Sequence, residues 1–192
     1  LLGNKRITTS KYSGTTLKSI NNKIPNTEIT IIDTPGLIPD GRISDLIKVE
    51  TGLKLVPAGE ISRKTFKLDA GQVFMFDVFC RFKILENELL KSGSKPIFSA
   101  YSSKDVKYHT TREERVQELI DKGFFKILNG YEREMYFQNE FYTQVIELEE
   151  NEELAIAGLG WINVKRGPLK LELTAPKDVK IVVRPGILKA KK

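Results

Sequence analysis

Short apolar runs broken by turn-forming residues dominate this sequence, a pattern that favours β-strands over long helices. Near the start, residues 15–20 (TTLKSI) and 27–32 (TEITII) are β-prone, and the six residues between them, NNKIPN, are mostly turn-formers. We expect two adjacent strands joined by a tight connection. Residues 33–42 (DTPGLIPDGR) then hold two prolines and two glycines, which predicts a loop.

Two segments have helical periodicity. In residues 43–56 (ISDLIKVETGLKLV) one face is apolar, formed by Ile43, Leu46, Ile47 and Val49. In residues 111–123 (TREERVQELIDKG), Thr111 and Glu114 have the spacing of a capping box, and Gly123 supplies a stop. We therefore predict a second helix that begins at Thr111.

Strand patterns return from about residue 57 onward. DAGQ, residues 69–72, is typical of a hairpin turn, and residues 134–184 contain one strand-like run after another. The expected fold class is α+β. A small α/β part occupies residues 1–56, and an α+β domain rich in antiparallel strands occupies residues 57–192.

Composition limits the class of protein. Hydrophobic residues make up 40% of the 192 residues, which is enough for a core. No window approaches the roughly 20 apolar residues of a membrane span, and the first residues are too polar for a secretory signal. The single cysteine, Cys80, excludes an internal disulfide and is expected to be a buried, inert thiol. We expect a protein of the cytoplasm or of an organelle matrix, not of a membrane.

Charge is segregated along the chain. Residues 1–24 hold five basic residues and no acid, residues 132–153 hold eight glutamates against one arginine, and residues 160–192 hold nine basic against two acidic residues. A polyanionic partner such as RNA is one interpretation. The other interpretation is that the charges lie on solvated strand faces and in a lysine-rich tail without a partner. A charge sum alone does not choose between the two interpretations.

A pair of loops near the start has the composition of a nucleotide switch. Such a switch needs a hydroxyl that ligates magnesium, a carboxylate that holds the ion's water shell, and a glycine whose N–H reaches the terminal phosphate. Thr15 and Thr16 supply the hydroxyl, Asp33 follows an apolar strand, and Gly36 comes three residues later. Asp-x-x-Gly alone is common at the end of strands. With both threonines upstream, it favours a GTPase switch pair. Leu37 cannot orient a water molecule as a glutamine there would.

The segments ITTSKYSGTTL, IDTPGL, EISRKTFKL, GQVFMFDVFCRF and GLGWINV resemble the later part of the YqeH-type circularly permuted GTPases. These are bacterial and organellar assembly factors of the small ribosomal subunit. In that family a zinc-binding module, the Asn-Lys-x-Asp motif and the P-loop precede the two switches, and a C-terminal domain follows. Ser13 departs from the family, which usually has proline there.

The resemblance implies roles for individual residues. Thr16, or less favourably Thr15, is the switch I magnesium ligand; Asp33 is the switch II carboxylate that holds magnesium; Gly36 contacts the terminal phosphate. Leu37 matches the apolar residue that replaces glutamine in GTPases assisted by potassium. The cofactors of the intact protein are then GTP and Mg²⁺, with K⁺ as a further candidate and zinc only in a segment absent from this sequence. Residues 1–56 are the C-terminal part of the GTPase domain, and residues 57–192 are a recognition domain with a basic tail.

Two motifs of a working GTPase are missing from the sequence. No Gly-x-x-x-x-Gly-Lys-Ser/Thr occurs among the 192 residues, and GNKRITT near the start lacks the aspartate of the base-recognition motif. Without a P-loop no backbone N–H groups cradle the phosphates. We therefore expect these residues alone to be inactive on GTP and to form part of a longer protein.

The family likeness implies that residues 57–192 couple nucleotide state to recognition of small-subunit ribosomal RNA or protein. Candidate RNA-binding residues are Lys165, Arg166, Lys170, Lys180 and Arg184. Tyr131, Tyr136 and Phe137 either stack on bases or belong to the core, and His109 stands alone, without support for a metal site. A different function stays open, that of a stand-alone β-rich module that binds nucleic acid or peptide without nucleotide chemistry.

Overall fold

The computed structural model describes residues 20–33 and 39–187 and divides into two units, residues 1–40 and 41–192. In the first unit, β1 (Ile20–Lys23) pairs antiparallel with β2 (Thr30–Asp33). The Ile24 N–H donates to the Ile29 carbonyl at 2.9 Å and closes the connection. Two adjacent antiparallel strands are present as expected, but β1 includes Asn21, Asn22 and Lys23, which the sequence assigned to the turn. Residues 15–19 of the predicted first strand lie outside the described residues.

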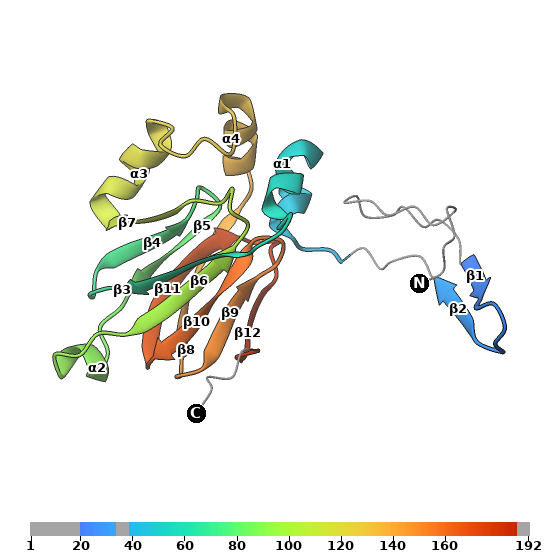
Figure 1. Cartoon of the computed structure of the whole chain (residues 1–192). Coiled ribbons are helices and arrows are strands. Elements are labelled where there is room, and N and C mark those ends of the chain that lie inside the picture. Colours follow the sequence, from blue (N-terminus) through green and yellow to red (C-terminus); the bar gives the residue numbers. More distant parts are fainter. Residues whose placement is uncertain (1–19, 34–38, 188–192) are drawn as a thin grey trace. The chain divides into compact units, whose positions relative to one another are not determined.

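The second unit contains two five-stranded antiparallel sheets (Figure 1). The first sheet has the order β12 (Ile181–Pro185), β9 (Glu152–Ile156), β10 (Gly160–Arg166), β6 (Ile97–Ser102) and β3 (Ser62–Lys67). The second sheet has the order β7 (Tyr108–Arg112), β4 (Gln72–Phe76), β5 (Cys80–Ile84), β11 (Leu169–Pro176) and β8 (Phe141–Leu148).

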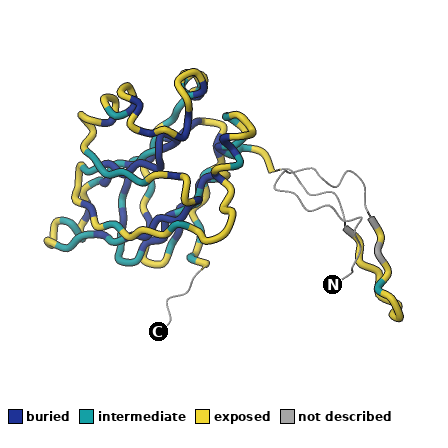
Figure 2. Tube along the Cα trace, turned by 45° about the horizontal axis from the view of Figure 1, so that its top comes forward, coloured by how far each residue is buried: buried dark blue, intermediate teal, exposed yellow. Residues whose placement is uncertain are grey.

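A cluster of aromatic rings lies between the two sheets and joins them face to face. Phe74 of the second sheet lies 4.8 Å from Phe66 and 5.3 Å from Phe98, both of the first sheet, measured between ring centroids. Phe74, Phe82 and Phe98 are completely buried. Offset and edge-to-face contacts of this kind stabilise a core beyond the area they bury. Figure 2 shows that buried positions follow the strands of this sandwich.

Four α-helices and one 3-10 helix complete the described part of the second unit. They are η1 (Ile43–Leu46), α1 (Val49–Leu55), α2 (Glu88–Lys91), α3 (Glu113–Asp121) and α4 (Gly130–Phe137). Mixed helices and antiparallel sheets confirm the predicted α+β class. No helix in residues 20–33 and 39–187 is long and apolar enough to cross a membrane.

Three local predictions were wrong. Thr111 does not cap a helix, because it pairs with Val73 in the ladder between β7 and β4, and α3 begins two residues later at Glu113. DAGQ is not a hairpin turn, because it joins β3 of the first sheet to β4 of the second. The strand-like run that began at residue 134 is helical up to Phe137, because Asn129 caps α4 by accepting a hydrogen bond from the Glu132 N–H.

Candidate functional site

Asp33, the predicted switch II carboxylate, is the last residue of β2 and pairs with Ile20 of β1. It therefore stands at the end of an apolar strand, as the motif requires. Thr15, Thr16, Gly36 and Leu37 lie outside the described residues. The donor set itself, hydroxyl and carboxylate oxygens, suits Mg²⁺. The nucleotide and magnesium roles stay predictions.

The segment that follows the switch motif is built into the second unit. The carbonyl of Gly41 accepts a hydrogen bond from the Lys180 N–H at 2.8 Å, and the Ile43 N–H donates to the Ala157 carbonyl at 2.9 Å. Ile43 is completely buried. These contacts place the start of the compact unit at Gly41, inside the part that the sequence assigned to residues 1–56. The assignment of domains at residue 56 stays a prediction.

A buried carboxylate holds the next helix in place. Glu132 on α4 is 4% exposed. One of its oxygens accepts from the Lys48 N–H and the other from the Thr51 hydroxyl, each at 2.9 Å. Lys48 is the N-cap of α1 and makes no side-chain cap of its own. Glu132 therefore caps α1 from another helix, where negative charge also complements the helix dipole.

The five candidate RNA-binding residues do not share one strand or one sheet. Lys165 and Arg166 are on β10 and Arg184 is on β12, both in the first sheet, whereas Lys170 is on β11 in the second. Lys180 precedes β12.

The side chains of Arg184 and Arg166 are held by protein partners. Arg184 Nε lies 3.1 Å from an oxygen of the buried Glu153, and Arg166 Nε donates to the Lys95 carbonyl at 2.8 Å. Both contacts hold the guanidinium groups against the protein. The proposed RNA role of the five stays a prediction.

Of the three candidate stacking residues, Tyr136 belongs to the core. It is fully buried and donates from its hydroxyl to the Phe79 carbonyl at 2.6 Å. Phe137 is half-buried and stacks on Phe141. Tyr131 is 65% exposed, and Lys48 lies over its ring.

A cavity of about 540 Å³ lies between β7 and α3 and was not predicted from the sequence. His109, which stands alone in the sequence, lines it together with Arg112, Arg115 and Phe124. The linear sequence carries no signal for this grouping, because a strand, a helix and the following turn contribute to it. Only their packing brings these side chains to one place.

Comparison with known proteins gives two family matches. Residues 1–101 match the model described as 50S ribosome-binding GTPase, and residues 95–187 match the model described as YqeH-like, C-terminal. The two matches meet in β6, which pairs with β3 on one side and β10 on the other. One sandwich therefore contains residues from both matches.

The chain is also similar to the uncharacterized protein YqeH of Bacillus subtilis (strain 168), with 27% identity over 184 residues. The alignment covers 95% of this chain and 48% of that protein, so the chain spans about half the length of that relative. The resemblance to YqeH-type proteins is thereby confirmed. From these matches we conclude that the chain belongs to the 50S ribosome-binding GTPase family and carries a YqeH-like C-terminal region.

Proposed function

We propose that this chain is the switch and recognition part of a GTP-binding protein that acts in biogenesis of the small ribosomal subunit. One observation carries the proposal: the segment directly after the predicted switch II motif is anchored inside the second unit, through buried Ile43 and through Glu132. Because the switch loop and this segment are consecutive in the chain, a conformational change in the loop is transmitted to the sandwich. The family membership favours this function over a stand-alone binding module.

In this proposal Thr16 and Asp33 hold Mg²⁺ and Gly36 contacts the terminal phosphate of GTP. GTP would supply the terminal phosphoryl group whose presence the two loops sense, and Mg²⁺ would offset its negative charge. Circular permutation places the base-recognition motif and the P-loop before these residues in a longer protein. Because Leu37 cannot orient water as a glutamine would, K⁺ is our candidate for assisting hydrolysis in its place. Zinc belongs to a preceding module.

The anchored segment is the element through which nucleotide state is transmitted. Gly41 and Ile43 make backbone hydrogen bonds to the second unit, and α1 is capped by Glu132. Free hinge motion of this segment would break these hydrogen bonds and leave polar groups without partners, which costs free energy. A shift of the switch loop is therefore passed on to the second unit. The proposed compartment is the cytoplasm or an organelle matrix, where ribosomes are assembled.

The partner claim is tested by sedimentation of the purified chain with separated ribosomal subunits. We expect the chain to move with the small subunit and to be released as salt is raised, because basic residues contact phosphates. The family description names the large, 50S subunit, so the large subunit is the decisive comparison. Preference for the large subunit, or binding that is insensitive to salt, would contradict the proposal.

A further inference from the structure

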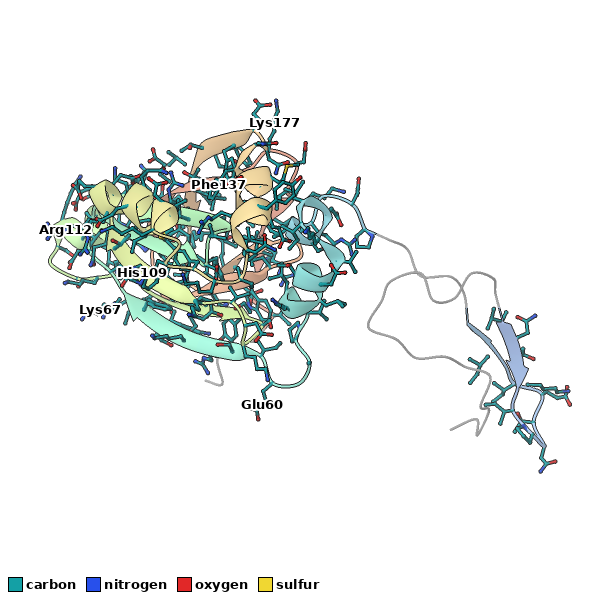
Figure 3. The ribbon with its side chains drawn as sticks, turned by 90° about the horizontal axis from the view of Figure 1, so that it is seen from above. Glu60, Lys67, His109, Arg112, Phe137 and Lys177 are labelled. Carbon is teal, nitrogen blue, oxygen red and sulfur yellow. The ribbon has the colours of Figure 1, made fainter. Side chains whose placement is uncertain are left out.

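The cavity between β7 and α3 is open, and its lining combines apolar surface with a net positive charge. Its volume is about 540 Å³. β7 is one of the two edge strands of the second sheet. Figure 3 labels His109 and Arg112 on this strand, close to α3.

Cationic side chains outnumber acidic ones around this cavity. Arg112, Arg115 and Lys122 line it together with one acid, Glu118. Lys122 and Glu118 pair with each other at 2.6 Å. Arg112 and Arg115 are exposed, and within the part of the chain that the structure describes neither forms an ion pair or a side-chain hydrogen bond. Two guanidinium groups are thus available to an anion, and guanidinium is well suited to phosphate.

An aromatic surface stands beside these charges. Phe124 is 45% exposed, and its ring centroid lies 4.7 Å from that of His109. Burial and the nearby charge of Arg115 lower the pKa of His109. The ring is therefore neutral at pH 7, with one nitrogen that donates and one that accepts a hydrogen bond. A flat apolar ring and a neutral polar ring together fit a nucleobase better than they fit a simple anion.

We propose that this cavity binds a nucleotide unit of single-stranded RNA. Arg112 and Arg115 contact its phosphate, and Phe124 stacks on its base beside His109. Stacking on aromatic rings together with phosphate contacts is the usual basis of single-strand binding. The inference rests on the proposed recognition of ribosomal RNA and gives it a location, distinct from the five basic residues that the sequence suggested.

The test measures binding of a short, fluorescently labelled single-stranded RNA of mixed sequence by anisotropy, over a series of salt concentrations. We compare the wild-type chain with the double variant Arg112→Gln/Arg115→Gln and with Phe124→Ala. The matched control is Lys54→Gln/Lys104→Gln, which removes the same charge from exposed residues that do not line the cavity. Circular dichroism and the thermal midpoint verify that each variant is folded.

Loss of two phosphate contacts is expected to reduce the slope of log K against log salt by about 1.4, because each contact to a single strand contributes about 0.7. Phe124→Ala is expected to weaken binding about tenfold, since one stacked base is lost. The lysine control is expected to retain nearly the full slope. AMP is expected to compete weakly, because it offers one nucleotide without the neighbouring phosphates of a strand.

Each contrary outcome is distinct. If the wild-type chain binds RNA and the arginine variant binds it as tightly as the lysine control, the cavity is not the site, whereas the proposed function stands. AMP that binds as well as the strand would overturn the choice of RNA in favour of a free nucleotide. If the chain sediments with ribosomal subunits but does not bind the labelled RNA, this inference is overturned and the proposed function stands. Absence of binding to both RNA and subunits overturns the proposed function with it.

Discussion

The hydroxyl of Thr51 on α1 donates a hydrogen bond of 2.9 Å to the carboxylate of Glu132 on α4, 81 residues further along the chain. Both side chains are almost completely buried. The second carboxylate oxygen accepts from the Lys48 N–H. This contact ties the helix after the switch motif to the C-terminal region, and the two do not separate without leaving buried polar groups unpaired.

Replacement of Glu132 by alanine is therefore expected to destabilise the chain by about 2–4 kcal/mol, because the buried Thr51 hydroxyl and the part-buried Lys48 N–H lose their acceptor. Glu132→Gln retains one carbonyl acceptor and is expected to cost less. Urea denaturation followed by circular dichroism measures both. Glu134, exposed on the same helix, provides the control, and Glu134→Ala is expected to change stability by less than about 0.5 kcal/mol. Equal effects at the two positions would show that Glu132 is not a structural cap.

Stability is expected to depend on pH through Asp77, which is 1% exposed. Burial raises the pKa of its carboxyl from 3.8 to about 6, although N–H groups of Lys107 and Val78 donate to it and oppose the shift. Between about pH 4 and pH 6 the folded chain thus holds a proton that the unfolded chain has lost. The free energy of unfolding is expected to fall by up to about 3 kcal/mol as pH rises through this window, and Asp77 adds no further change above it.

Asp77→Asn removes the titrating group at a position with φ of 51°, a conformation that asparagine tolerates. The difference between wild type and variant, measured by urea unfolding from pH 4 to pH 7.5, isolates the contribution of Asp77 from that of other carboxyls. Parallel curves for the two proteins would refute the assigned shift.

Gly160 is expected to be irreplaceable at the start of β10. Its φ is +158°, and a Cβ there would overlap the backbone carbonyl of Tyr101 on the paired strand β6. Gly160→Ala is expected to cost at least about 2 kcal/mol of stability, since the clash involves backbone that cannot move aside. Gly59→Ala serves as control, because a Cβ there meets nothing within 4 Å. Thermal midpoints that match for both variants would contradict the expectation.

Cys80 is expected to resist thiol reagents in the folded chain. It is 4% exposed, and burial raises the pKa of its thiol well above the ordinary value. The thiolate is the reactive species, so both access and ionisation are suppressed. Dithionitrobenzoate is expected to react with the one thiol only after denaturant is added. Rapid reaction under native conditions would mean that β5 is not packed as described.

The purified chain is expected to show no GTP hydrolysis, because its sequence contains no P-loop to cradle the phosphates. Release of inorganic phosphate from GTP, followed with and without K⁺, measures this directly. Turnover that does not co-elute with the chain on a further column is assigned to a contaminating GTPase. Robust turnover that survives this control would overturn the assignment of these residues as the switch part of a larger domain.

Family membership was predictable from short motifs, because switch chemistry requires particular residues at fixed spacing. Asp33 at the end of an apolar strand is one example. The GLGWINV segment is a second motif, in which the close approach of backbone constrains Gly160. The helix start at Glu113 was not predictable, because the capping pattern at Thr111 competes with the pairing of Thr111 to Val73 in the ladder between β7 and β4. Pairing with β4 prevails there, and local sequence contains no information about the partner strand.

The candidate RNA residues illustrate the same division. Their charge was visible in the sequence, but Arg184 is held by a buried glutamate and Arg166 by a backbone carbonyl. Tyr136, a candidate for stacking, is buried in the core. No sequence pattern distinguishes Arg112 or Phe124, since single arginines and phenylalanines are common in proteins.

The sequence by itself determined the α+β class, the resemblance to YqeH-type proteins and the buried thiol, because each depends on residue type and on spacing within local segments. Only the tertiary structure decided which strands share a sheet, that Glu132 caps α1, and that His109, Arg112 and Phe124 line one cavity. These features join residues far apart in the chain. Their geometry is set by the packing of two sheets around one aromatic core, which no local pattern specifies.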